Sequence, residues 1–128
     1  MSTQTIRILI AGALFVHGIG HTLGIWKPAR SLLFFNVPEP ALSLAGGVIW
    51  VLIAVGFIVS SMSFYGILFP ANWWRPLAVI FAVISLAGLI VFGRTWPTFN
   101  RIGAYAMNIA TLLALLWLKW PPLDMFNR

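Results

Sequence analysis

The chain lacks cysteine altogether and has very few acidic residues. Without cysteine it has no disulfide, no thiol nucleophile and no cysteine-ligated zinc or iron–sulfur site. Only two acidic residues are present, Glu39 and Asp124, and both lie outside the long apolar runs. Paired carboxylates for acid–base chemistry are therefore absent from those runs, and a serine nucleophile such as Ser85 would have no acid to orient its histidine. The sequence favours a role other than catalysis.

Charge is scarce as a whole. Charged residues make up 8% of the 128 residues and hydrophobic residues 61%, whereas a soluble domain carries roughly a quarter charged residues. The apolar runs predict four transmembrane helices, near residues 6–26, 41–60, 76–93 and 102–120, each close to the length that crosses a bilayer. None of the eight prolines interrupts these spans. We expect an all-α integral membrane four-helix bundle, a single domain over residues 1–128, with the lipid bilayer as its principal partner.

The ends of the predicted spans are rich in aromatic residues. Six of the seven tryptophans lie there and are expected to anchor at the headgroup level: Trp26, Trp73, Trp74, Trp96, Trp117 and Trp120. In the first loop, residues 31–35 are apolar and predict a short turn of helix along the membrane surface. The segment "SSMSFYG" either extends the second helix past Ser60 or folds back along the interface.

The eight basic residues are scattered singly at span ends, which indicates headgroup contact and not nucleic-acid binding. Four lie on the side of the termini and middle loop, and four on the side of the first and third loops: Arg7, Arg75, Lys119 and Arg128, against Lys27, Arg30, Arg94 and Arg101. This tie permits insertion in both orientations, so a dual-topology small transporter is an alternative. The spans, however, contain neither a carboxylate nor a pair of broken half-helices.

Small residues at a spacing of four are typical of helix–helix contacts in lipid. Three such pairs occur, one on each of the first three spans: Gly20 with Gly24, Ser43 with Gly47, and Ala78 with Ala82. They predict packing seams and no function beyond bundle formation.

The stretch "VHGIGHTLGIW" places two histidines inside the first span. His17 and His21 are four residues apart, so they project from nearly one face of the helix, about 13 and 7 Å below the first-loop side. Each other helix offers a polar side chain within about one turn of that depth: Trp50, Ser85, and Asn108 with Thr111. We predict that these side chains converge on a ligand-binding pocket open toward the first and third loops. Its mouth is expected at Glu39, Arg94, Trp96, Asn100 and Arg101.

Several chemistries suit two buried imidazoles. They can serve as interhelical hydrogen bonds alone. Two ligands are too few for a metal site, so none is predicted. A haem needs only one or two axial nitrogens, and Ala13, one turn before His17, leaves room for a macrocycle. A quinone would accept hydrogen bonds from imidazole N–H, Trp50 or Asn108, and a histidine suits proton exchange.

These observations predict a small membrane binding or accessory protein with a histidine-lined pocket for a lipophilic cofactor such as a quinone or haem. In this hypothesis Arg94 and Arg101 hold the pocket mouth. The alternative is a purely structural subunit of a larger membrane complex. The expected partners are a second copy of the chain or such a complex.

Four stretches carry a family resemblance, in the order "HGIGHTLG", "GGVIWVLIAV", "NWWRPLAVIFAVIS" and "TWPTFNRIGAYAMN". They resemble a family of small bacterial four-helix membrane proteins of uncharacterised activity, with HGxxHxxG on the first helix. The matching positions are His17, His21, Trp50, Trp74, Trp96, Gly103 and Asn108. In size and layout the chain is also similar to DoxX-like proteins, some of which are partners of quinone-linked oxidoreductases. These resemblances imply a bacterial inner-membrane location and favour a quinone or an accessory role.

Overall fold

The computed structural model describes residues 2–26, 36–122 and 125. Four α-helices account for most of this part of the chain: α1 (Thr3–His21), α2 (Glu39–Phe64), α3 (Trp74–Phe92) and α4 (Thr98–Leu112). Short 3-10 turns η1 (Thr22–Gly24), η2 (Ala71–Trp73) and η3 (Gly93–Thr95) adjoin them, and a π-helical segment η4 (Leu113–Trp117) continues α4. The surface helix predicted over residues 31–35 lies outside the described residues.

The helices begin where local chemistry favours a start. Ser2 caps α1, since its side-chain oxygen accepts a hydrogen bond from Thr5 N at 3.1 Å. Pro38, Pro70 and Pro97 immediately precede α2, η2 and α4. Proline has a fixed φ and no N–H to leave unpaired, so it suits the entrance of a helix. The proline positions thus mark the helix boundaries as the sequence predicted.

The helical stretches differ from the predicted spans by about a turn at some ends. The four stretches long and apolar enough to cross a membrane are Thr3–Gly24, Glu39–Phe64, Ala71–Thr95 and Thr98–Trp117. The second helix therefore continues past Ser60, which decides between the two alternatives for "SSMSFYG". It ends before Gly66, whose φ of +68° is readily adopted only by glycine. Over the residues that the structure describes, the protein is an all-α integral membrane protein with four spanning helices.

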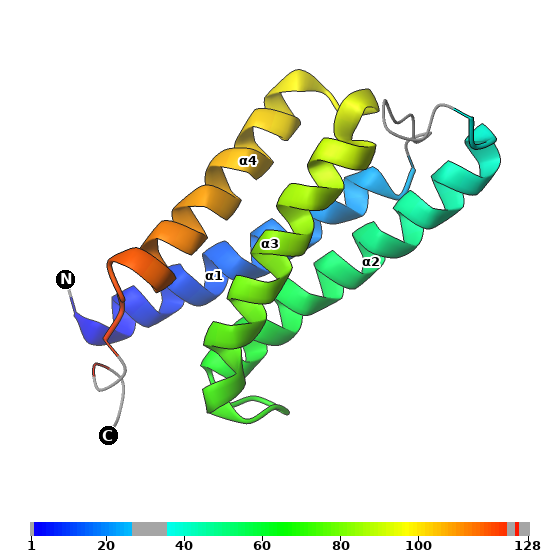
Figure 1. Cartoon of the computed structure of the whole chain (residues 1–128). Coiled ribbons are helices and arrows are strands. Elements are labelled where there is room, and N and C mark those ends of the chain that lie inside the picture. The colour runs from blue at the N-terminus through cyan, green and yellow to red at the C-terminus, as the bar shows by residue number, and fades with distance from the viewer. Residues whose placement is uncertain (1, 27–35, 123–124, 126–128) are drawn as a thin grey trace.

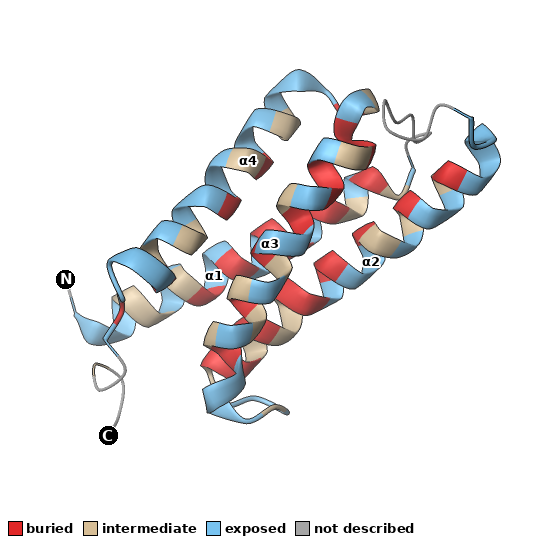
Figure 2. Ribbon diagram, in the orientation of Figure 1, coloured by how far each residue is buried: buried red, intermediate tan, exposed pale blue. Residues whose placement is uncertain are grey.

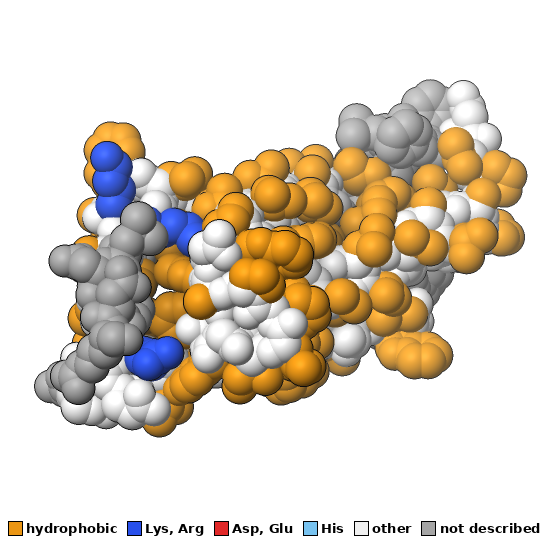
Figure 3. All heavy atoms as spheres, turned by 90° about the horizontal axis from the view of Figure 1, so that it is seen from below, with side chains coloured by type: hydrophobic (Ala, Val, Ile, Leu, Met, Phe, Trp, Pro, Cys, Tyr) orange, Lys and Arg blue, Asp and Glu red, His pale blue; other side chains and the backbone are white. Residues whose placement is uncertain are grey.

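Successive helices are neighbours in space (Figure 1), and α4 packs mainly on α3 while touching α1 more sparsely. Both termini lie at the same end of the bundle (Figure 1). Apolar side chains cover most of the face seen in Figure 3, and the Lys and Arg side chains visible on it gather at one end. This distribution matches an apolar surface in contact with lipid and a basic end at the headgroup level.

The core lies mainly between α2 and α3, whose inward faces are buried (Figure 2). Ala78 and Ala82 are both 0% exposed, so the packing seam predicted on the third helix is confirmed. The predicted Gly20–Gly24 seam is wrong at Gly20, since an added Cβ there would meet nothing within 4 Å. Gly18 takes its place: a Cβ there would lie 2.9 Å from the Ala54 carbonyl oxygen of α2.

Two of the tryptophans expected at the headgroup level are instead core residues. Trp74 is 9% exposed and Trp96 is 6% exposed, and they pack inside opposite ends of the bundle. The other four expected anchors are exposed, as predicted: Trp26, Trp73, Trp117 and Trp120. A tryptophan near a span end can therefore close the core as readily as anchor in lipid.

Candidate functional site

Four buried polar side chains from three helices form a closed ring of polar contacts. His17 Nε2 lies 2.9 Å from Asn108 Oδ1, and Asn108 Nδ2 donates to Ser85 Oγ at 2.6 Å. Ser85 Oγ lies 3.1 Å from His21 Nε2, which is 3.4 Å from His17 Nε2. The structure thus brings together residues that the sequence singled out on α1, α3 and α4.

The direction of the hydrogen bonds follows from the asparagine amide. Because Nδ2 of Asn108 is the donor to Ser85, the other amide atom, Oδ1, accepts, and His17 must donate through Nε2–H. Ser85 Oγ, having accepted from Asn108, is free to donate its own hydrogen to His21 Nε2. His17 is therefore the donor that starts a chain of three hydrogen bonds, which runs through Asn108 and Ser85 to His21. In this arrangement the 3.4 Å contact between the two histidine Nε2 atoms closes the ring without a hydrogen of its own.

Aromatic rings surround the second histidine. The His21 ring stacks nearly parallel to Trp50 and to Phe57, with centroid distances of 5.5 and 5.9 Å. Trp96 lies 5.8 Å from His21 and 4.7 Å from Trp50. Gly24 makes this packing possible, since a Cβ there would come within 2.5 Å of Trp96 and 2.6 Å of Trp50.

Two outcomes here differ from the sequence analysis. Phe57 was missed, although it lies seven residues after Trp50 and therefore on the same helix face. Trp96 was expected at a pocket mouth, but it is a wall of the site, because η3 and Pro97 turn it inward. Within the described residues, Trp96 Nε1 and His21 Nδ1 are buried without a hydrogen-bond partner.

A groove with a volume of about 180 Å³ runs beside the ring, between α1 and α4. We call it the α1–α4 groove. Its lining comes from α1, from α4 with η4, and from one closing end: Ile10, Ala13, Leu14 and His17; Met107, Ala110, Thr111, Ala114 and Leu115; Trp74, Trp120 and Pro121. The lining is almost entirely hydrocarbon, and His17 is its ring-forming polar residue.

The position of this groove corrects the predicted pocket. The pocket was expected to open toward the first and third loops, whereas the α1–α4 groove extends from His17 toward the end of the bundle that holds the termini. The physical reason is the rotation of α1. The face of α1 that carries His17 continues toward the N-terminus with three apolar residues, Leu14, Ala13 and Ile10, which line the groove. Across the groove, the small side chains of Ala110 and Ala114 on the fourth span leave space.

Thr111 does not join the ring. Its hydroxyl donates to the carbonyl oxygen of Met107 at 2.8 Å, one turn earlier on α4. Thr111 nevertheless lines the α1–α4 groove together with His17. It lies in the groove wall and not among the residues that hold the histidines.

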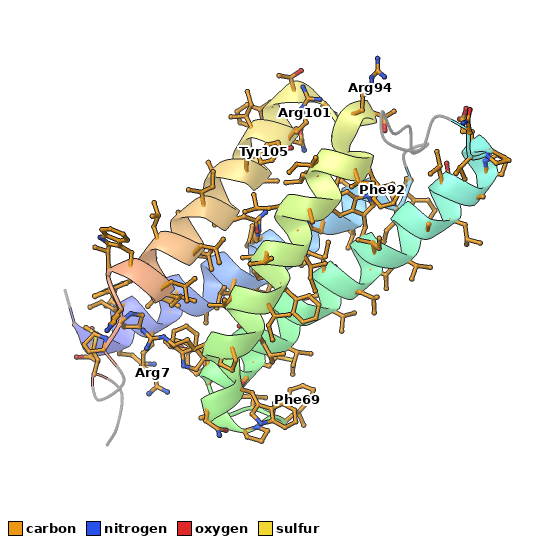
Figure 4. All side chains as sticks on the ribbon, in the orientation of Figure 1. Arg7, Phe69, Phe92, Arg94, Arg101 and Tyr105 are labelled. Atoms are coloured by element: carbon orange, nitrogen blue, oxygen red, sulfur yellow. The ribbon has the colours of Figure 1, made fainter. Side chains whose placement is uncertain are left out.

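The residues expected at the pocket mouth do not form one entrance to the histidines. Arg94 and Arg101 lie at the end of the bundle away from Arg7, and Arg94 points outward (Figure 4). Glu39 is exposed in the first turn of α2. Asn100 and Trp96 line a separate pocket of about 200 Å³ with Leu23 and Pro97, and His21 is not part of its lining.

A second group of polar residues, at the opposite end of the bundle, was missed. The hydroxyls of Ser60, Ser61 and Ser63 on α2 donate to the carbonyl oxygens of Trp74, Ala11 and Pro70, respectively. All three serines are buried. Their partners are backbone atoms, so these bonds join elements, and the cluster of serines in "SSMS" was the available signal.

Two arginines lie at this same end. Arg7 lies over the Tyr65 ring at 5.2 Å, and Arg75 lies over the Trp74 ring at 5.8 Å. Arg75 also donates to the Pro121 carbonyl oxygen at 3.0 Å. Since Trp74 and Pro121 both close the groove, Arg75 fixes the end of the groove wall.

In the part of the chain that the structure describes, no three His, Asp or Glu side chains come close enough together to hold a metal ion. The arrangement can instead hold a small polar group at His17 with an apolar body along the groove. Comparisons of the chain with protein families, with curated proteins and with solved structures find no match.

Proposed function

We propose that this protein binds one lipophilic molecule in the α1–α4 groove, with the polar head of the molecule against His17. The carrying observation is the combination of one imidazole and a hydrocarbon wall in the same groove. A polar side chain within a membrane span is costly unless it meets partners, and it marks functional positions more often than not. The His17 ring meets Asn108 through Nε2 while another part of its surface borders the groove.

The wall opposite His17 supports the proposal. The fourth span changes from an α-helix to the π-helical segment η4 at Leu113, and Ala114 and Leu115 of that segment line the groove. π-helical turns are rare and occur frequently at functional sites, because they displace side chains from regular α-helical positions. The irregular segment thus coincides with the cavity.

The shape of the site supports a slender head group better than a haem. A haem ligated through His17 Nε2 would require that nitrogen to leave Asn108, 2.9 Å away. A volume of about 180 Å³ also suits a single small ring with a tail that leaves between the helices. A molecule with a single quinone-sized ring, in its oxidised or reduced form, meets both conditions. Following the motif resemblance, we propose the bacterial inner membrane as the location.

A second candidate role rests on the ring itself. The four side chains of the ring bond to one another, which favours a purely structural subunit in which the histidines join α1 to α3 and α4. In that case the groove would hold only lipid chains. The two candidate functions predict different results when the groove is filled. Filling it should remove binding of a ligand with a polar head group if the protein is a binding protein, and should remove no such binding if the protein is purely structural.

A groove-filling substitution tests the proposed function. Ala110→Phe places a ring inside the groove, while Ala106→Phe places one on an exposed position of the same helix, one turn earlier. The probe is a benzoquinone with a ten-carbon tail, offered in oxidised and reduced forms. Its binding is measured by quenching of tryptophan fluorescence, since Trp74 and Trp120 line the groove.

We expect Ala110→Phe to weaken binding of the probe by at least about tenfold, because a ring in a packed groove excludes the ligand. Ala106→Phe should bind like the wild type. The proposal fails if the wild type binds neither form, or if both variants bind equally well.

A further inference from the structure

We infer that the molecule held in the α1–α4 groove is a hydrogen-bond donor, a lipophilic phenol, quinol or other hydroxyl-bearing compound, and not a quinone or ether. This inference rests on the proposed function and deepens it. It follows from the direction of hydrogen bonds at the polar end of the groove.

The hydrogen bonds of His17 leave one of its ring nitrogens for a guest. Its Nε2–H donates to Asn108 Oδ1, because the amide Nδ2 of Asn108 is already the donor to Ser85. A neutral imidazole that carries its hydrogen on Nε2 presents Nδ1 as an acceptor. Both hydrogen bonds that the structure describes for His17 use Nε2, so Nδ1 is the nitrogen left for a guest.

Thr111 is the other polar residue of the groove near His17. Its single hydroxyl hydrogen is given to the Met107 carbonyl oxygen at 2.8 Å. The lone pairs of Thr111 Oγ1 can still accept a hydrogen bond. His17 and Thr111 therefore both offer acceptors to the groove, and neither offers a donor.

The remaining side-chain N–H groups of the lining belong to Trp74 and Trp120. The indole N–H groups of Trp74 and Trp120 are donors, but these residues close the far end of the groove with Pro121. From His17 to Ile10, which lines the same groove, is seven residues of helix, or about 10 Å. A head group that lies beside His17 and Thr111 therefore meets acceptors, and a carbonyl there would find no donor on these two residues.

A matched pair of probes tests the inference: 4-nonylphenol and its methyl ether, which share their apolar body and differ in the O–H group. Binding of each to the purified full-length protein in lipid nanodiscs is measured by tryptophan quenching. We expect the phenol to bind about threefold to tenfold more tightly than the ether, the effect of one hydrogen bond.

Two variants locate the preference. His17→Phe keeps a ring in the groove wall and removes the Nδ1 acceptor, and Thr111→Val removes the hydroxyl with little change in shape. We expect His17→Phe to abolish the preference for the phenol and Thr111→Val to reduce it. A cooperative unfolding transition shows that each variant is folded.

The outcomes distinguish a failure of the proposed function from a failure of the inference that the ligand is a hydrogen-bond donor. If neither probe binds, or if Ala110→Phe leaves both affinities unchanged, the proposed function itself is overturned. If both probes bind the groove equally, or the ether binds more tightly, the groove remains a binding site and the donor inference is overturned. Loss of the preference in His17→Phe, with the apolar body of the probe still bound, supports it.

Discussion

At the scale of the residue, the protein places four polar side chains where lipid would leave them unsatisfied. His17, His21, Ser85 and Asn108 resolve this by bonding to one another across three helices. Interhelical hydrogen bonds in membranes contribute about 0.6 to 2 kcal/mol each, and members of one network are coupled. The ring therefore acts as a unit, in which the loss of one member leaves the others partly unpaired.

A double-mutant cycle measures that coupling. Ser85→Ala and Asn108→Ala each remove two bonds of the ring, the one that joins them and one to a histidine. We expect each to lower the free energy of unfolding by about 1 to 2 kcal/mol. The bond between Ser85 and Asn108 can be lost only once. The free-energy loss of the double variant should therefore be smaller than the sum of the two single losses, by at least about 0.5 kcal/mol. Unfolding in detergent by heat or denaturant gives these values.

Ser61 supplies the matched control for this cycle. Its hydroxyl bonds to the Ala11 carbonyl oxygen at 2.8 Å, and it shares no partner with Asn108. The effects of Ser61→Ala and Asn108→Ala should therefore add. Additivity in both cycles would show that the ring is not a coupled network.

At the scale of the element, close approach between helices depends on single glycines and not on motif counts. Gly18 and Gly20 lie on the same helix within one turn, yet only Gly18 faces α2. A Cβ at Gly18 would lie 2.9 Å from the backbone oxygen of Ala54 and 3.0 Å from the Cβ of Phe57, and neither atom moves freely. The contact between α1 and α2 thus needs glycine at this position.

The pair provides a prediction with its control built in. Gly18→Ala should lower the free energy of unfolding by about 1 to 3 kcal/mol, the usual cost of overpacking, because α1 must move away from α2. Gly20→Ala should have little effect or stabilise slightly, since alanine favours the helix and meets open space. Unfolding of the two variants under one condition checks this, and equal losses would contradict the assignment of the contact to Gly18.

At the scale of the whole molecule, four spanning helices return the chain to the side on which it began. The start of α1 and the end of η4 lie at one end of the bundle, on the side of Arg7, while Arg94 and Arg101 lie at the other (Figures 1 and 4). The basic residues of the full sequence are divided evenly between the two sides. Charge alone therefore leaves the direction of insertion undecided.

Reporters fused to the N- and C-termini test this arrangement. We expect both reporters to show the same side of the membrane, because each of the four helices crosses it once. Reporters on opposite sides would mean that one helix does not cross. If each terminus is found on both sides, the dual-topology transporter becomes the better description, and a single orientation removes the reason for proposing it.

The sequence by itself determined the class of the protein, the four spans and the depth of the polar side chains. Those features depend on hydrophobic length and on a rise of 1.5 Å per residue, which are local properties of the chain. Counting along each helix placed His17, His21, Ser85 and Asn108 within about one turn of each other in depth, and the structure joins them there.

Only the tertiary structure decided which way each helix is rotated. That rotation turned Trp96 inward, left Gly20 facing open space, and put the groove on the side of His17 that faces Ala110 and not toward the first and third loops. It also set the hydrogen-bond partners of His17, on which our proposal for the kind of ligand rests. In a chain this apolar almost every helix face can meet lipid, so hydrophobic pattern does not specify rotation, and packing between helices does.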